Sequence, residues 1–149
     1  MQQVVRKMRF VWLGLLASQL IFLVVVAVVI SQGEPVSSTS SQQWVQAMFL
    51  ISVTLLVSLV AVGYIVRKFI YESGQEKMIV SPQGYFTGNL VLFGECEAIA
   101  VFSLVVTMLS GTFGVVVLPA AIAIVVQVIN FPTVRPMQAG ELQIGIREP

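Results

Sequence analysis

Residues 85–131 read YFTGNLVLFGECEAIAVFSLVVTMLSGTFGVVVLPAAIAIVVQVINF. This stretch is nearly all apolar and about 47 residues long, whereas one helix needs only about 20 residues to cross the hydrocarbon core of a bilayer. It therefore predicts two membrane-spanning helices joined by a tight turn. We place that turn at SGTFG, residues 110–114, because glycine disfavours helix continuation. The two helices are then expected over residues 85–109 and 115–131, with Pro119 in the first turns of the second, where a missing N–H group is tolerated.

Two further apolar runs precede this stretch, at residues 10–30 and 44–66. The first follows a basic segment, as in a signal peptide, but it exceeds the roughly 7–15 apolar residues of such peptides and lacks a small-residue cleavage site. We interpret it as an uncleaved transmembrane helix, with a signal peptide as the alternative. The predicted fold class is an all-α integral membrane protein, an antiparallel bundle of four transmembrane helices over residues 10–131.

The segments between and after the apolar runs are more polar. Residues 31–43 are rich in Ser and Gln and contain Gly33 and Pro35, which predicts a flexible loop. Residues 69–88 combine charged residues with turn formers, which predicts a short amphipathic or extended piece along the membrane surface. The tail, residues 132–149, is expected to be extended or disordered. We expect no soluble domain among these segments.

The composition excludes several classes of protein. Of the 149 residues, 57% are hydrophobic and only 10% are charged, whereas a soluble domain usually carries about 25% charged residues. The formal net charge of +1 gives no reason to expect nucleic-acid binding. The sequence has no histidine and a single cysteine, Cys96, so it allows no intramolecular disulfide, no histidine-ligated metal and no Ser-His-Asp triad. We therefore predict no metal site, no cofactor and no enzymatic activity.

The positive charges predict the orientation. All Lys and Arg residues lie in the N-terminal segment (residues 1–9), in the loop between the second and third spans, or in the tail, and the other two loops have none. Because cytoplasmic loops are enriched in Lys and Arg, both termini are expected on the cytoplasmic side of a bacterial inner membrane. The aromatic residues near the ends of the predicted spans are expected in the interfacial belt: Trp12, Trp44, Tyr64, Tyr71 and Tyr85.

Glu95 and Glu97 are the only charged residues inside the predicted third span. A charged side chain at the centre of a bilayer costs about 3 kcal/mol or more, so such residues usually face a partner, a cavity or an ion path. Residues two apart in a helix differ by about 200° in direction, so the two carboxyl groups are expected on nearly opposite faces. Both are candidate ion- or proton-binding residues. Glu97 is the deeper of the two, whereas Glu95 could reach the interface or Asn89.

Three interpretations of these glutamates stay open. In the first, the carboxyl groups are protonated, as desolvation favours, and hydrogen-bonded to another helix or subunit. The available partners are Gln19, Ser52, Thr54, Ser58 and Gln127, and of these Gln19 and Gln127 are the candidates for polar contacts between helices. In the second, Glu97 exchanges a proton or cation during transport. In the third, it binds an arginine of a partner. A third span that starts only at Ala98 would instead leave both glutamates among the lipid headgroups.

The segment at residues 97–106, EAIAVFSLVV, resembles the ion-binding helix of the proteolipid (c) subunit of rotary ATP synthases. That family carries a Glu followed by Ala and apolar residues, an aromatic residue five positions on, a small residue and a Leu-Val run. The resemblance implies that Glu97 carries a proton or sodium ion, with Phe102 at the aromatic position. The chain departs from the family in having four predicted helices with this Glu in the third, and only Gly63 in the preceding span, where the family has closely spaced glycines. As a whole, the chain is similar to uncharacterised four-span bacterial membrane proteins.

The short predicted loops and the lack of a catalytic set of residues favour a non-catalytic accessory or structural subunit of a membrane complex. The alternative is proton or cation translocation through an oligomer, with Glu97 as the ion-binding residue, similar to an ATP synthase c subunit. The expected partners are the lipid bilayer and either further copies of the chain or other membrane subunits.

Overall fold

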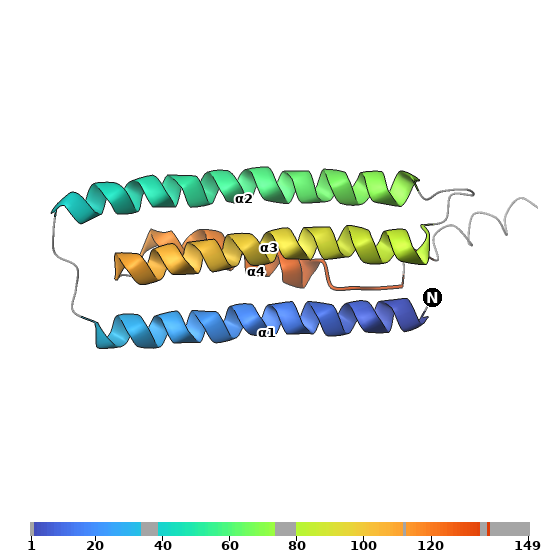
Figure 1. Cartoon of the computed structure of the whole chain (residues 1–149), viewed down its shortest axis with the longest axis horizontal. Helices are drawn as coiled ribbons and strands as arrows, with labels where there is room; N and C mark the ends of the chain where they lie inside the picture. The colour runs from blue at the N-terminus through green and yellow to red at the C-terminus, as the bar shows by residue number, and fades with distance from the viewer. Residues whose placement is uncertain (1, 34–38, 74–79, 112, 135–136, 138–149) are drawn as a thin grey trace, which may run out of the picture.

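The computed structural model of the chain describes residues 2–33, 39–73, 80–111, 113–134 and 137. Its elements are α1 (Gln2–Gln32), α2 (Thr39–Ser73), α3 (Pro82–Ser110), the 3-10 turn η1 (Val115–Val117) and α4 (Leu118–Ile129) (Figure 1). The described part of the chain contains no strand, so the all-α prediction is confirmed.

Three of the helices have the length of a membrane span. α1, α2 and α3 contain 31, 35 and 29 residues, and each has a window apolar enough to cross a membrane by length and composition. α4 has 12 residues, fewer than the roughly 20 that a helix needs to cross a bilayer. The described chain therefore has three candidate membrane-spanning helices and one shorter apolar helix.

The helices extend beyond the predicted apolar runs. α1 begins at Gln2, so most of the segment expected to precede the first span continues that helix. The prediction of a surface segment over residues 69–88 is wrong at both described ends, because residues 69–73 belong to α2 and residues 82–88 belong to α3; residues 74–79 lie outside the described residues. A helix need not end where its sequence becomes polar, since exposed ion pairs one turn apart, such as Lys68–Glu72 at 3.8 Å, are compatible with it.

Both ends of α3 have recognisable signals. Ser81 is the N-cap, and its Oγ accepts a hydrogen bond from the Gly84 N–H at 3.0 Å, with Pro82 in the first turn. At the other end Gly111 has φ 66°, in the left-handed region, and its N–H donates to the Met108 carbonyl at 3.2 Å. The predicted turn at residues 110–114 is therefore confirmed at Gly111, and Pro119 does lie in the first turn of α4.

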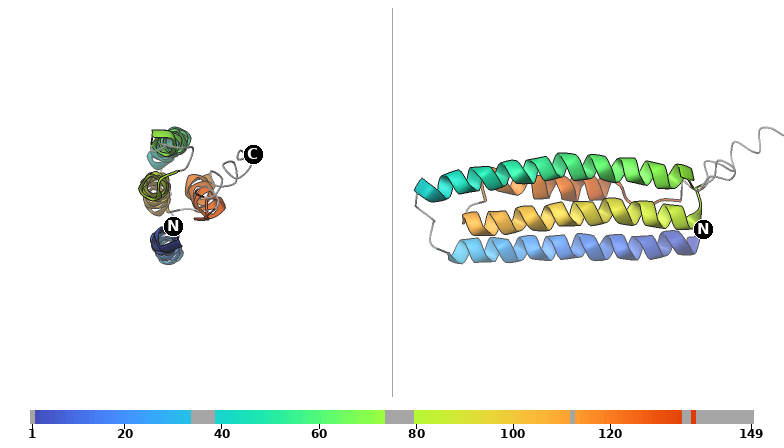
Figure 2. Two further views of the ribbon diagram at one scale, coloured as in Figure 1. Left: turned by 90° about the vertical axis from the view of Figure 1, so that its right-hand side faces the viewer. Right: turned by 45° about the horizontal axis from the view of Figure 1, so that its top comes forward.

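α3 lies in the middle of the molecule (Figure 2, left). α1 and α2 pack on its opposite flanks and, over their described residues, make no contact with each other. α4 packs against a third side of α3, and α1 and α3 run in one direction while α2 and α4 run in the other (Figure 1). One side of α3, between α1 and α2, is consequently left uncovered by the described chain. We call it the open face of α3; its exposed residues are Thr87, Leu90, Gly94, Ala98 and Val101.

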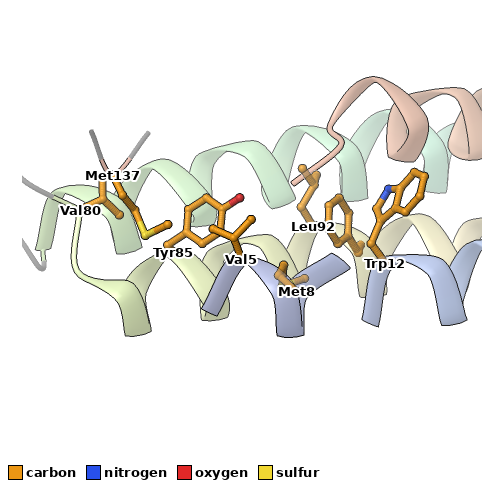
Figure 3. Close-up of a cluster of buried hydrophobic side chains, with 8 residues drawn as sticks. Val5, Met8, Trp12, Val80, Tyr85, Leu92 and Met137 are labelled. Atoms are coloured by element: carbon orange, nitrogen blue, oxygen red, sulfur yellow. The ribbon is translucent and has the colours of Figure 1, made fainter. Parts of the chain in front are cut away.

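The buried side chains form two clusters. The first lies at the end where α1 and α3 begin, and consists of Val5, Met8, Trp12, Val80, Tyr85, Leu92, Phe93 and Met137 (Figure 3). The second lies toward the other end and consists of Val26, Leu56, Cys96, Ile99, Ala100, Leu104, Ala120 and Ala123. Together they show that α3 supplies the largest share of the interior, which explains why both predicted glutamates lie close to other helices.

The first cluster contains three residues that the sequence did not predict to be buried. Trp12 and Tyr85, expected in the interfacial belt, are only 8% and 1% exposed, so that prediction is wrong for these two. Trp44 and Tyr64, at 40% and 42% exposed, keep the surface position expected of belt residues. Met137, in the segment expected to be extended or disordered, is 0% exposed and lies beside Tyr85 (Figure 3). The described part of the tail therefore packs onto the helices at this residue.

Candidate functional site

Glu97 lies close to the middle of α3 and faces α1. Its Oε1 is 2.5 Å from Ser18 Oγ, and its Oε2 accepts a hydrogen bond from Gln19 Nε2 at 2.9 Å. The side chain of Glu97 is half-buried and Ser18 is exposed, whereas Gln19 is fully buried. The carboxyl group thus lies at the rim of the α1–α3 interface, with one partner at the surface and one in the interior.

Gln19 links this carboxyl group to α4. The same Nε2 atom donates to Gln127 Oε1 at 2.7 Å, and Gln127 is also 0% exposed. Gln127 and Trp12 add a further connection, because Trp12 Nε1 donates to the Gln127 carbonyl oxygen at 2.8 Å. Trp12, Ser18, Gln19, Glu97 and Gln127 therefore form one hydrogen-bonded network across α1, α3 and α4, which we call the Glu97 cluster. Both glutamines expected to make contacts between helices lie in it.

Ser18 Oγ has two close oxygen neighbours, and the number of hydrogens available for these two contacts depends on whether Glu97 is protonated. Ser18 Oγ lies 2.8 Å from the Leu15 carbonyl oxygen as well as 2.5 Å from Glu97 Oε1. A serine hydroxyl has one hydrogen, so it can donate to only one of these two acceptors. When it donates to Leu15, the contact with Glu97 requires a protonated carboxyl group, whose O–H donates to Ser18 Oγ. When Glu97 is ionised, Ser18 donates to Glu97 instead. The 2.8 Å contact of Ser18 Oγ with the Leu15 carbonyl oxygen then lacks a hydrogen, so only a protonated Glu97 supplies a hydrogen for both contacts.

One atom of the cluster is left without a partner. Gln19 uses its Nε2 group for two hydrogen bonds, but its buried Oε1 accepts none within the described residues. An unpaired amide oxygen in an apolar interior is unfavourable by about 1–3 kcal/mol. Since the amide plane is held by both Glu97 and Gln127, the orientation of Gln19 follows from these two acceptors rather than from its own oxygen.

Glu95 points to the opposite flank of α3, toward α2. A Cβ atom added at Gly63 of α2 would lie 3.2 Å from the Glu95 carboxyl carbon, so the carboxyl group occupies the space that the glycine leaves free. Its buried Oε2 has no hydrogen-bond partner among the described residues. Asn89, one of the two places that Glu95 could reach according to the sequence, is engaged elsewhere: its Nδ2 donates to the Tyr71 hydroxyl and to the Tyr85 carbonyl oxygen, both at 2.8 Å. Thus Glu95 and Glu97 face different helices, as their spacing predicts.

The hydroxyl groups proposed as further partners of the glutamates serve their own helix. Ser52, Thr54 and Ser58 of α2 donate to backbone carbonyl oxygens one turn earlier, at 2.9, 2.9 and 2.8 Å. Such bonds are common for Ser and Thr within helices. Each of the three therefore uses its hydroxyl hydrogen within α2.

A second polar cluster, which the sequence interpretation missed, lies where α2 and α4 end. Arg67 donates from Nε to the Tyr71 hydroxyl at 3.1 Å and from Nη1 to Asn130 Oδ1 at 2.8 Å. Asn130 Nδ2 in turn donates to the Tyr64 hydroxyl at 2.6 Å, and Asn89 joins through Tyr71. We call these five residues the Arg67 cluster. The sequence does indicate this cluster in part: Tyr64, Arg67 and Tyr71 are spaced by three and four residues, which places all three on one side of α2.

The described residues offer no metal site. No group of three or more His, Cys, Asp or Glu residues is close enough to hold a metal ion in the part of the chain that the structure describes. Cys96, which stands between Glu95 and Glu97 in the sequence, is fully buried. It packs in the second apolar cluster. The site chemistry that remains is that of carboxyl, amide and hydroxyl groups.

Comparison of the chain with protein-family models, with curated proteins and with solved structures finds no match.

Proposed function

We propose that this chain is a small integral membrane protein that acts as a non-catalytic subunit of a larger membrane assembly. The observation that carries the proposal is the open face of α3, which no other described element covers and which has the Glu97 cluster at its edge. A face that must be covered within the membrane, and that carries polar groups at its rim, suits contact with a transmembrane helix of another subunit.

The size of the side chains on the open face supports close contact. Gly94 and Ala98 are one turn apart, and a Cβ atom added at Gly94 would have nothing within 4 Å. Small residues one turn apart allow the backbones of two transmembrane helices to approach closely. Leu90 and Val101, at 41% and 37% exposed, lie a turn away on either side and would pack around such a contact.

The polar rim indicates the chemistry of the partner helix. Ser18 is exposed and Glu97 is half-buried, so part of this pair faces outward at a depth where lipid tails offer no hydrogen bonds. A helix with an amide or a cationic side chain at the matching level would donate to Glu97 or Ser18. The occupant that fits this face is therefore a partner transmembrane helix with at least one hydrogen-bond donor near its centre.

The positive charges support an orientation for this subunit. The basic residues of α1 and α2 lie at one end of the molecule, where α1 starts and α2 ends: Arg6, Lys7, Arg9, Arg67 and Lys68. By the positive-inside rule, this end faces the cytoplasm of a bacterial inner membrane. Both the start of α1 and the end of α4 then lie on the cytoplasmic side.

The test is gentle extraction of the chain from its own membrane, followed by native mass spectrometry. We expect a defined complex with other membrane proteins, disrupted by Ala98→Phe on the open face. Val57→Phe is the matched control, because Val57 is 66% exposed on α2, away from that face. A wild-type chain that is stable and homogeneous alone would contradict the proposal, as would equal disruption by the two variants.

A second candidate function, proton or cation translocation through a homo-oligomer, is favoured by the position of the Glu97 carboxyl group, which is half-buried at the rim of the α1–α3 interface and within hydrogen-bond distance of Ser18 and Gln19. The resemblance of residues 97–106 to the ATP synthase c subunit points in the same direction. This candidate predicts a closed ring of identical chains and carbodiimide labelling of Glu97 that is greater at low than at high pH. Labelling that does not change with pH, or no ring, would count against it.

A further inference from the structure

We propose that Arg67, held by Tyr71 and Asn130, is a binding site for the phosphate group of an anionic membrane lipid. The site lies at the end of α2 where the basic residues gather, and it is separate from the open face of α3. The proposal requires only that α2 crosses a membrane, so it stands or falls independently of the partner subunit proposed above.

The charge of Arg67 is not neutralised by the described protein. Both side-chain acceptors of its guanidinium group, the Tyr71 hydroxyl and Asn130 Oδ1, are uncharged. The described residues contain one salt bridge, between Lys68 and Glu72, and it does not involve Arg67. A half-buried guanidinium group with only neutral partners retains its attraction for an anion.

The two acceptors are themselves held in place. Asn130 donates through Nδ2 to the Val126 carbonyl oxygen at 2.8 Å and to the Tyr64 hydroxyl at 2.6 Å. Tyr71 accepts from Asn89, and its ring lies against Gly88, where an added Cβ would be 2.9 Å from the ring. The guanidinium plane is therefore oriented from two sides before any ligand binds.

This orientation leaves donors free for a ligand. Nε and Nη1 each make one hydrogen bond to the protein, whereas Nη2 makes none to the described residues. An arginine with a fixed plane and free N–H groups is well suited to phosphate, whose oxygens match the guanidinium fork. Arg67 also makes a cation–π contact with Tyr71, at 5.2 Å from the ring centroid, which adds to the hydrogen bond in holding the guanidinium group.

The surroundings favour a lipid as the source of the phosphate. Tyr64 and Phe69, within three residues of Arg67, are 42% and 70% exposed, as expected for side chains in contact with the membrane interface. Arg9 lies on another side of the end of α4, where its Nε donates to the Pro132 carbonyl oxygen at 3.2 Å and its guanidinium lies over Phe131. A headgroup at Arg67 would thus sit at the membrane surface, where anionic lipids are attracted by Lys and Arg residues.

The experiment measures lipid retained by the purified full chain in detergent, by native mass spectrometry, with phosphatidylglycerol or phosphatidylcholine added. We expect phosphatidylglycerol to bind wild-type protein and Arg67→Gln to weaken this binding by roughly tenfold, the loss of a charge-assisted hydrogen bond. Lys68→Gln is the matched control, because Lys68 is adjacent, carries the same charge and has a 77% exposed side chain. It should change the binding by less than about twofold, as expected for an exposed charge.

A third variant, Arg67→Lys, distinguishes loss of the binding site from misfolding of the protein. Arg67→Lys keeps the charge but lacks the planar fork, so it should fold and still bind phosphatidylglycerol several-fold more weakly than wild-type protein. Equal losses in the Arg67→Gln and Lys68→Gln variants would overturn the proposal, because they would indicate attraction by diffuse charge. Equal binding of the two lipids would overturn it as well. Displacement of the lipid by millimolar inorganic phosphate would overturn the lipid assignment in favour of a soluble phosphate.

Discussion

The two flanks of α3 hold a glutamate in different ways. On the flank that faces α1 and α4, Glu97 contacts a hydroxyl and an amide group, and the network continues to Gln127 and Trp12. On the flank that faces α2, Glu95 packs against Gly63 and keeps a buried oxygen without a partner. α3 therefore makes polar contacts on one flank, whereas on the other flank its side chains pack against a glycine of α2. The two glutamates are therefore expected to contribute differently to the stability of the fold, because each contacts a different neighbouring helix.

This difference predicts which substitutions each flank tolerates. The α2 flank should be sensitive to added volume, whereas the α1 and α4 flank should be sensitive to loss of hydrogen bonds. The measurement in each case is the free energy of unfolding in mixed detergent micelles.

The largest effect is expected for Gly88→Ala on the α2 flank. The new methyl group would lie 2.9 Å from the Tyr71 ring and 3.3 Å from Arg67 Cγ. Overpacking of this kind destabilises by about 2 kcal/mol. Gly94→Ala is the matched control, since nothing lies within 4 Å of its added Cβ, and it should be neutral or slightly stabilising. Equal effects of the two variants would show that α2 and α3 are less closely packed than described.

Gln19→Leu should be the most damaging change on the other flank. It removes the two hydrogen bonds of Gln19 Nε2, to Glu97 and to Gln127, and leaves both acceptors with fewer donors. Bonds between transmembrane helices contribute about 0.6 kcal/mol each on average and up to roughly 1.7, so we expect a loss of about 1.5 kcal/mol. Gln46→Leu, at an exposed position of α2, is the control and should have little effect.

Replacing each glutamate by leucine should have different effects on stability. Glu97→Leu removes the acceptor of Gln19, while Ser18 can still donate to the Leu15 carbonyl oxygen, so about 1 kcal/mol of stability should be lost. Glu95→Leu removes an unpartnered buried oxygen and should be neutral or stabilising. The comparison between the flanks fails if Glu95→Leu is the more destabilising of the two.

The smallest loss of stability is expected for Trp12→Phe. It removes the hydrogen bond from Nε1 to the Gln127 carbonyl oxygen but retains an aromatic ring near Phe131, whose centroid lies 5.0 Å from that of Trp12. A loss of about 0.6 kcal/mol follows from one such bond. Trp44→Phe, at a 40% exposed position, should change the unfolding free energy less. If both variants behave alike, Trp12 acts only through its ring.

Much of the secondary structure was predictable because it depends on local properties of the chain. Apolar length indicated the helices, and Gly111 indicated the end of α3, since its positive φ is costly for other residues. The divergence of Glu95 and Glu97 also followed from helical geometry. The helix ends were less predictable, because α2 continues past Arg67 and Lys68 to Ser73, although hydropathy falls there.

The partners of each polar side chain were not predictable in the same way. Among the groups considered for Glu97, Gln19 is a partner while Ser52, Thr54 and Ser58 bond to their own helix, and Ser18 was not considered. Trp12 and Tyr85 resembled belt residues by their place in the sequence but lie in the interior. Which partner a side chain meets depends on how each helix is rotated about its axis and shifted along its neighbours.

For this protein, hydropathy and glycine placement therefore indicated a helical fold with long apolar helices, and helical geometry placed Glu95 and Glu97 on nearly opposite faces of one helix. These properties act over one or two helical turns, so they can be read along the chain. Packing determined that α3 lies in the middle, that Glu97 meets Gln19 and Gln127, and that Arg67 meets Asn130 from a segment 63 residues away. Such contacts join residues far apart in sequence, and their formation depends on helix rotation and register, which no local pattern specifies.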